Sequence, residues 1–315
     1  MLSRFFRKPG TRAYYEEFAA KADYSHWKWL HGYVYGRWPQ LYIALGTGRH
    51  PLARMFSPLA ALLRGPKAAE TGRTTCRTSS SGQKAFADTY HGKVLHLEHA
   101  TKLVSVNRDI DLGDLEQIIP YAAAREIVLR HPEHIVALEC PCRASSPSPC
   151  RPLDVCLIVG EPFAGFIAEH HPDKTRWISP REAQDILRAE HERGHVHHAF
   201  FKDVMLGRFY AICNCCSCCC GALQAHRGGT PMLASSGYVC VKDSGKCVHC
   251  GLCARQCQFH AIRRDEDGWR LDADECMGCG VCVTKCPKDA LTLVRAPARG
   301  EPLDIQEIMT YRGLS

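Results

Sequence analysis

The sequence contains no long hydrophobic run. The longest apolar stretches, residues 41–45 and 59–63, are far shorter than the roughly 18 residues that a membrane-spanning helix needs. The first ten residues carry positive charge, but neither an apolar segment nor a twin-arginine signal accompanies them, so we expect no secretory signal. We therefore expect a cytoplasmic protein, free or associated with the inner face of the membrane. Thiols stay reduced there, and clustered cysteines bind metals more often than they form disulfides.

Other motifs are also missing. The chain has no Gly-x-Gly-x-x-Gly dinucleotide fingerprint and no P-loop, so no flavin or nicotinamide site is indicated. No module that reads nucleic acid accompanies the basic residues. We therefore expect no nucleic-acid partner.

Cysteine, in contrast, is abundant. The chain has 315 residues, a mass of 35.2 kDa and 20 cysteines, about one cysteine in sixteen residues. A hydrophobic content of 45% and a mean hydropathy of -0.23 are typical of a soluble globular protein. A chain of this length can bury a core without disulfide bonds. The cysteines therefore need a different explanation.

The positive charge is concentrated near the N-terminus. Residues 1–75 hold 12 Lys and Arg against 4 Asp and Glu, whereas residues 76–315 hold 28 against 29. Twelve aromatic residues lie within the first 42 positions. Three interpretations remain open: a helical segment that packs on the rest of the protein, a docking segment for a partner subunit, and an anchor on an anionic membrane. We favour packing or docking on protein over the membrane.

Composition divides the chain into five parts. Residues 1–75 form the basic aromatic segment, and residues 76–89 are predicted to be a linker. Residues 90–240 are predicted to be a cysteine-rich α/β domain, residues 241–295 a smaller cysteine-rich module, and residues 296–315 a tail.

Local patterns predict several elements. Helices are expected at 120–130, 180–193 and 304–311, and strands at 135–138, 155–159, 196–201 and 208–212. The helix at 180–193 has the clearest boundaries. Ser179 and Glu182 form a capping box at its start, and Gly194 ends it.

Eight cysteines form an internal repeat with a period of 29 residues. Both halves have the spacing Cys-x2-Cys-x2-Cys-x3-Cys: Cys247, Cys250, Cys253 and Cys257, then Cys276, Cys279, Cys282 and Cys286. This run is typical of iron–sulfur cluster ligands. Gly251 and Gly280 occupy equivalent positions, where a small residue lets the backbone turn closely around the cluster. A pair of zinc knuckles explains neither the third cysteine of each run nor the duplication.

On these motifs, residues 244–295 resemble a bacterial-type two-[4Fe–4S] ferredoxin domain, about a sixth of the chain. The second half has the usual Cys286-Pro287 ending of the family, whereas the first half has Gln258 where the family usually has proline. That departure lowers backbone rigidity but removes no ligand. More broadly, residues 134–295 resemble multi-cluster [4Fe–4S] proteins of anaerobic bacteria.

The resemblance implies that the fourth cysteine of each run crosses to the other cluster. The first cluster is then assigned to Cys247, Cys250, Cys253 and Cys286, and the second to Cys257, Cys276, Cys279 and Cys282.

Ten more cysteines lie upstream in two groups: Cys140, Cys142, Cys150 and Cys156, then Cys213, Cys215, Cys216, Cys218, Cys219 and Cys220. Adjacent side chains of an extended segment point in opposite directions, so one cluster cannot use all six of the second group. We expect one or two further [4Fe–4S] clusters. The first group is the favoured ligand set and four of the second group form another, with an exchange of ligands between the groups left open.

Other interpretations of these ten cysteines are a structural zinc site with spare thiols and a redox-active disulfide pair. Arg143 is a candidate to neutralise a cluster or to donate hydrogen bonds to its sulfide. Cys76 and Cys240 are not expected to be ligands. His191 and His195 lie four residues apart, but Gly194 interrupts the helix between them, so we interpret them as part of a solvated helix end.

His249 and His260 flank ligands of the first cluster, where they either tune its potential or lie at the surface. The fold expected is α+β: a ferredoxin-like two-cluster module appended to a mixed α/β cysteine-rich domain, with a helical basic N-terminal segment.

The function expected is iron–sulfur electron transfer, by an independent carrier or by a subunit of a larger oxidoreductase, with a protein redox partner. The basic N-terminal segment is the candidate for docking to that partner or for peripheral membrane contact. The alternative is a reductase, in which the central cysteines carry a catalytic cluster or thiol pair that the ferredoxin module supplies with electrons. No catalytic residue is assigned.

Overall fold

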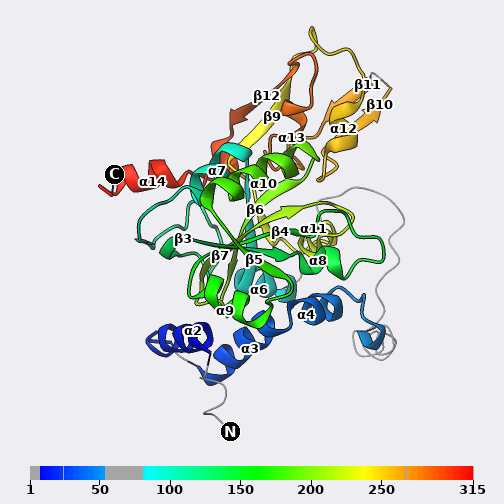
Figure 1. Cartoon of the computed structure of the whole chain (residues 1–315). Coiled ribbons are helices and arrows are strands. Elements are labelled where there is room, and N and C mark those ends of the chain that lie inside the picture. The colour runs from blue at the N-terminus through cyan, green and yellow to red at the C-terminus, as the bar shows by residue number, and fades with distance from the viewer. Residues whose placement is uncertain (1–7, 24, 54–80, 267, 315) are drawn as a thin grey trace.

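A computed structural model describes residues 8–23, 25–53, 81–266 and 268–314 (Figure 1). Cys76, which is not expected to be a ligand, lies outside the described residues. The centre of the molecule is a mixed sheet of eight strands in the described part of the chain. These strands are β1 (Tyr90–Leu95), β2 (Ile110–Leu112), β3 (Ile127–Glu139), β4 (Asp154–Glu161), β5 (Thr175–Ile178), β6 (Val196–Lys202), β7 (Arg208–Cys215) and β8 (Leu233–Ala234).

The order across the sheet is β2-β3-β4-β7-β6-β1-β8, and β5 pairs with β3. The pairs are antiparallel except for β1 with β8. The strands β3, β4 and β7, which carry or lead into upstream cysteines, are therefore neighbours, although β7 is far from the other two in sequence. Their register aligns Leu138 with Cys156, and Cys156 with Cys213.

Helices cover both faces of the sheet (Figure 1). One face packs against α7 (Leu97–Val104), α10 (Pro180–Glu192) and α14 (Ile305–Tyr311). The other packs against α2 (Pro9–Ala19), α3 (His26–Arg37), α4 (Pro39–Gly46), α6 (Ser81–Thr89), α9 (Phe163–His170) and α11 (Gly221–Arg227). A short helix, α8 (Pro141–Ala144), follows β3. Because successive residues of a strand face opposite ways, Phe200 and Phe201 of β6 belong to different cores.

The C-terminal module lies at the opposite end of the molecule from α2 and α3 (Figure 1). It contains two pairs of antiparallel strands and two short helices. Its elements are β9 (Tyr238–Lys242) paired with β12 (Leu291–Arg295), β10 (Ile262–Asp265) paired with β11 (Gly268–Leu271), α12 (Leu252–Gln256), α13 (Val281–Thr284) and the 3-10 turn η1 (Pro297–Arg299).

Most predicted elements are present. The strands predicted at 135–138, 155–159, 196–201 and 208–212 fall within β3, β4, β6 and β7. The helix predicted at 180–193 is α10, and Ser179 Oγ accepts the Glu182 amide at 3.2 Å. The Glu182 carboxylate, however, pairs with Arg176 rather than closing the capping box. The predicted C-terminal helix is α14, capped by Asp304.

The helix predicted at 120–130 is wrong. Residues 120–126 contain no helix, and β3 begins at Ile127. Ala122 donates its amide to Asp88, and Ala124 has a φ of 54°, which interrupts a helical path. Ile127 and Leu129 are then buried on one face with the two-residue period of a strand.

The N-terminal segment is helical in its described part, and several of its rings are buried. Tyr14, Phe18, Tyr33 and Tyr35 pack in the same core as α9 and the sheet. Trp27, in contrast, is 80% exposed. No helix among the described residues is long and apolar enough to cross a membrane.

Candidate metal centres and the adjoining cavity

The two halves of the cysteine repeat have the same backbone course. Gly251 and Gly280 have φ of 74° and 80°, and each directly precedes a short helix, α12 or α13. An L side chain rarely adopts this left-handed conformation. The agreement extends to His260 and Asp289, which have φ of 57° and 47° at equivalent positions of the repeat. The repeat seen in the sequence is thus a structural repeat.

Each half contributes to two small cavities lined by cysteines. One cavity is lined by Cys247, Cys250, Cys253 and Cys286, together with apolar residues. The other is lined by Cys257, Cys276, Cys279 and Cys282. The structure therefore brings together the four thiols of each set that the ferredoxin resemblance implied, with the fourth cysteine exchanged between the two halves.

The surroundings of these thiols suit thiolate ligands. The amides of Ala261 and Ala290 donate to Cys257 Sγ and Cys286 Sγ, each at 3.3 Å. Burial raises the pKa of the Cys257 and Cys276 thiols, although backbone N–H donors oppose that effect. Thiols of this kind lose their protons when a metal binds them. The residues therefore fit a pair of iron–sulfur clusters.

Residues 246–290 match the family model described as a 4Fe-4S dicluster domain. The match supports a ferredoxin-type 4Fe-4S domain in this part of the chain, which is hereafter called the dicluster domain. Together with the number of cysteines, it points to iron–sulfur electron transfer. No curated protein matches the chain.

Cys240 lies in the wall of the second cavity of the dicluster domain. Its thiol is 3.6 Å from Cys282 Sγ, and its amide donates to Cys276 Sγ at 3.4 Å. It contacts two expected ligands although it belongs to neither cysteine run. The sequence offered no signal for this position, because β9 reaches the cavity only through its pairing with β12.

The ten upstream cysteines divide differently from the favoured expectation. Cys150 lies with Cys216, Cys218 and Cys219, and their four sulfur atoms are all within 4.8 Å of one another. We call these four the quartet. Cys150 was expected to join Cys140, Cys142 and Cys156. The structure instead places Cys150 with three thiols of the second group, an arrangement that the sequence had left open.

The quartet is tightly gathered. Cys150 Sγ lies 3.1 Å from Cys218 Sγ and 3.7 Å from Cys216 Sγ, and Cys218 Sγ lies 3.8 Å from Cys219 Sγ. A tetrahedral ion with bonds of about 2.3 Å to sulfur needs ligand sulfurs about 3.8 Å apart. Among the described residues, no three thiols of the dicluster domain gather within 4.8 Å. The spacing of the quartet thus fits one ion better than it fits a cubane.

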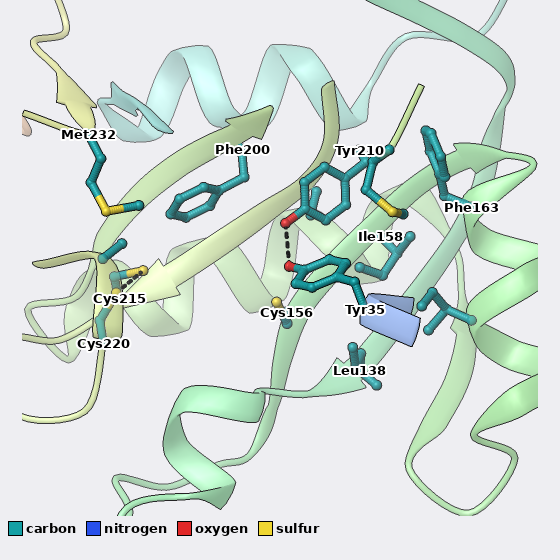
Figure 2. Packing of buried hydrophobic residues seen from close by; sticks show 14 of the residues in the cluster. Tyr35, Leu138, Cys156, Ile158, Phe163, Phe200, Tyr210, Cys215, Cys220 and Met232 are labelled. Atoms are coloured by element: carbon teal, nitrogen blue, oxygen red, sulfur yellow. Dashed lines mark hydrogen bonds between the residues drawn. The ribbon is translucent and has the colours of Figure 1, made fainter. Parts of the chain in front are cut away.

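The remaining six upstream cysteines line a larger cavity and are called the sextet: Cys140, Cys142, Cys156, Cys213, Cys215 and Cys220. Several of their sulfur atoms are in contact, among them Cys156 with Cys213 at 3.1 Å and Cys215 with Cys220 at 3.3 Å. Figure 2 shows the second of these pairs. The register of β4 and β7 sets the first pair. Cys220 directly precedes α11, so the start of that helix sets the second.

Arg143 is buried beside the sextet. Its guanidinium pairs with the buried carboxylate of Glu190 and donates to the carbonyl of Asn214 at 3.0 Å. Burial opposes ionisation of Glu190, but a hydrogen bond from His195 and the charge of Arg143 lower its pKa overall. The positive charge of Arg143 is thus already balanced. Its buried Nε has no partner among the described residues, which leaves one donor for a thiolate or sulfide.

The interpretation of His191 and His195 as a solvated helix end is wrong. Both are buried. His191 Nε2 lies 2.9 Å from Thr284 Oγ1 of the dicluster domain, and His195 Nδ1 lies 2.6 Å from Glu190. The dicluster domain covers this end of α10, which the sequence alone did not indicate. His249 and His260 are exposed.

Gln258, the residue that replaces the usual proline, joins the dicluster domain to the central domain. Its Oε1 accepts the amide of Ser217 at 2.7 Å, and its Nε2 donates to the carbonyl of Gly194 at 2.9 Å. Ser217 lies between Cys216 and Cys218 of the quartet, and Gln258 follows Cys257. The Gln258 side chain therefore connects the residue after Cys257, a candidate ligand, to the loop that carries three thiols of the quartet.

The cavity beside the sextet has a volume of about 580 Å³. One wall carries the sextet, and the others are largely aromatic and aliphatic, from α3, α4, β1, β6 and β7. Tyr35 and Tyr210 share a hydrogen bond of 2.7 Å between their hydroxyls, and Figure 2 shows this pair with Phe200 and Met232 in the same core. Burial raises the pKa of both tyrosines, so their hydroxyls keep their protons.

Proposed function

We propose that the protein is an iron–sulfur electron carrier, or the electron-transfer subunit of a larger oxidoreductase, in which the dicluster domain exchanges electrons with centres held by the upstream thiols. The observation that carries this proposal is the Gln258 bridge, which runs from one set of thiols to the other. Bound clusters accept and release one electron at a time. The protein supplies the ligands, the distances and the surrounding hydrogen bonds.

We assign one cluster of the dicluster domain to Cys247, Cys250, Cys253 and Cys286, and the other to Cys257, Cys276, Cys279 and Cys282, on the basis of the two cavities that these thiols line. The sextet is the proposed site of one further [4Fe–4S] cluster, and its spare thiols leave room for exchange of ligands. The quartet is the proposed site of a single iron or zinc ion because its sulfur atoms are so close together.

The proposed route between the centres follows the chain and two hydrogen bonds. Cys257 is adjacent to Gln258, whose side chain contacts Ser217 and the carbonyl of Gly194. Ser217 in turn is bonded to two residues of the quartet, and Cys215 of the sextet is the next residue but one. The route is short and passes through part-buried groups, which limits solvent rearrangement around it.

We propose that the N-terminal segment provides the surface for a protein redox partner. On α3, on α4 and between them, Trp27, Leu41 and Trp38 are exposed, although Tyr33 and Tyr35 of α3 are buried. Exposed tryptophan is typical of protein interfaces. The proposed location is the cytoplasm, with contact at the inner membrane face as the alternative for this surface.

Anaerobic reconstitution of the full chain tests the proposal. Iron and acid-labile sulfide are expected to correspond to three [4Fe–4S] clusters, with one additional metal ion. Replacing Cys279 by serine is expected to lower the cluster content of the dicluster domain, whereas replacing Ser217 by alanine, which keeps the bridging amide, is not. Tightly bound zinc with no absorption near about 400 nm, where iron–sulfur charge transfer falls, would refute electron transfer.

A reductase is the second candidate function, and the cavity favours it. A simple carrier needs no enclosed space of about 580 Å³ next to a set of thiols. A small molecule that changes the electron paramagnetic resonance signal of the reduced sextet centre would support this function. Identical spectra with and without every molecule that binds in the cavity would argue for the carrier alone.

A further inference from the structure

The cavity beside the sextet has the size and lining of a small-molecule site. Its volume of about 580 Å³ falls within the roughly 300–1,000 Å³ typical of ligand pockets. The two cysteine-lined cavities of the dicluster domain are far smaller, about 30 and 20 Å³. Because the sextet occupies only one wall, the aromatic part of the cavity is available to an organic molecule.

The lining away from the thiols is almost wholly apolar. It includes rings from three separate parts of the chain and the side chains of two methionines, and the residues are Tyr35, Tyr42, Phe86, Tyr90, Phe200, Tyr210, Met205 and Met232. Rings of this kind pack well against a flat or branched apolar group. Methionine adapts its shape to whatever lies against it. This lining predicts an apolar and preferably aromatic ligand.

Lys202 is the charged residue of this aromatic part of the lining, whereas Arg143 lines the cavity on the side of the thiols. Lys202 is the last residue of β6, it lines the cavity, and it is only 3% exposed. Its ammonium group makes no hydrogen bond or ion pair with any residue in the described part of the chain. The carboxylate of its neighbour Asp203 instead accepts the amide of Val204 at 2.6 Å. The cavity thus contains a buried positive charge that no carboxylate of the described residues contacts directly, although the charge of Asp203 acts on it.

Three tyrosine rings surround this ammonium group. Lys202 Nζ lies 4.4 Å from the ring centre of Tyr90, 4.9 Å from that of Tyr35 and 5.7 Å from that of Tyr42. Such contacts stabilise a cation in place, but they do not replace the hydration that a buried ammonium group has lost. An anionic group of a ligand would restore this balance. The three rings therefore hold the ammonium group of Lys202 in place, and a bound ligand would have to supply the anionic group that pairs with it.

We propose that the cavity binds an apolar aromatic carboxylate, with the carboxylate paired with Lys202 and the ring among the tyrosines, facing the sextet. Burial lowers the pKa of Lys202 to about 8, so the ammonium form predominates at neutral pH. This inference names a ligand class for the proposed reductase function. It rests on that function only for the reduction of the ligand after it has bound. Binding itself requires the cavity and Lys202.

The experiment compares two probes of similar shape, 2-naphthoate and uncharged 2-naphthylmethanol, on the full chain after anaerobic reconstitution. Binding is measured by displacement of anilinonaphthalene sulfonate fluorescence. The unmodified protein is expected to bind naphthoate roughly tenfold or more tightly than the alcohol, as expected for one charged hydrogen bond. Lys202→Met is expected to abolish this preference while leaving the affinity for the alcohol nearly unchanged. Lys202→Arg is expected to retain it.

Lys84→Met is the matched control, because Lys84 is exposed on α6 and its loss removes the same charge outside the cavity. Equal affinity of the unmodified protein for the two probes would overturn the proposal, whether or not any variant folds. So would loss of naphthoate binding when the clusters are inserted, because the sextet centre would then fill the cavity. Iron and sulfide are counted on the same samples. A full content of clusters without naphthoate binding would refute this inference but not the proposed electron transfer. Naphthoate binding without clusters would refute the proposed electron transfer but not this inference.

Discussion

Replacing Gln258 by alanine tests the connection between the two parts of the molecule. The change removes an acceptor 2.7 Å from the Ser217 amide and a donor 2.9 Å from the Gly194 carbonyl. A part-buried hydrogen bond contributes about 0.5–1.5 kcal/mol net, so the two together contribute about 1–3 kcal/mol. Gln258→Pro, which restores the residue usual in the ferredoxin family, is expected to lose the same two bonds.

The loss is expected to be local. Other contacts keep the dicluster domain in place, including His191 with Thr284 at 2.9 Å and Ser236 with the Gly278 carbonyl at 2.8 Å. The loop that carries the quartet should therefore open more often while the fold persists. An effect of about 1–3 kcal/mol corresponds to an opening constant raised roughly 5- to 150-fold.

Hydrogen–deuterium exchange of the peptide covering residues 213–220 in the reconstituted protein measures how often the loop that carries the quartet opens. Faster exchange is expected in Gln258→Ala and in Gln258→Pro, together with slower electron transfer from the dicluster domain to the upstream centres. Gln306→Ala is the control, because Gln306 is an exposed residue of α14. Unchanged exchange of this peptide in both Gln258 variants would refute the assignment of the bridge.

Three other perturbations address stability and redox tuning. Burial lowers the pKa of Lys93 to about 7, so above that pH the unfolded chain holds a proton that the folded chain lacks. The free energy of unfolding should therefore rise with pH from about 7 to about 10, by up to about 1.4 kcal/mol per pH unit. Lys93→Met should flatten this slope in urea titrations, and an unchanged slope would contradict the reasoning. Glu190→Gln leaves a buried guanidinium without its counter-charge and should cost about 3–5 kcal/mol in the same titrations. Glu182→Gln, at an exposed ion pair, should lower the free energy of unfolding by less than about 1 kcal/mol. Equal losses in the Glu190 and Glu182 variants would argue against a buried ion pair of Arg143 with Glu190. Cys240→Ala removes a thiol beside Cys282, a proposed ligand of the second cluster, and should lower the midpoint potential of that proposed cluster by about 40 mV, the equivalent of one weak hydrogen bond. A potential that does not move in redox titration would show that Cys240 does not act on the cluster.

The cysteine runs of the dicluster domain are predictable from the sequence because their ligands lie close together along the chain. Cys247, Cys250 and Cys253 share one loop, so spacing alone indicates their chemistry. The same holds for α10, where Ser179 and Glu182 mark a local boundary. In both cases the decisive interactions span only a few residues.

The upstream thiols are different because sheet pairing decides their neighbours. Cys156 meets Cys213 through the register of β4 with β7, and nothing within either segment indicates that register. Cys150 joins the quartet from a loop 66 residues before Cys216. The incorrect helix at 120–130 has a similar origin, since the local pattern around Pro120 is overridden by strand pairing at Ile127. The sequence therefore does not predict which segments far apart along the chain come into contact.

The hydrogen bond between Tyr35 and Tyr210 has a consequence for assembly. It joins positions 175 residues apart, and α3 and α4 line the cavity on the same face of the sheet as most of the sextet. While these helices are undocked, the sextet should be more open to metal donors than it is after they dock. We therefore expect metal insertion to precede docking of the first helices. We expect the docked N-terminal segment to limit the access of solvent to the proposed sextet centre from that side.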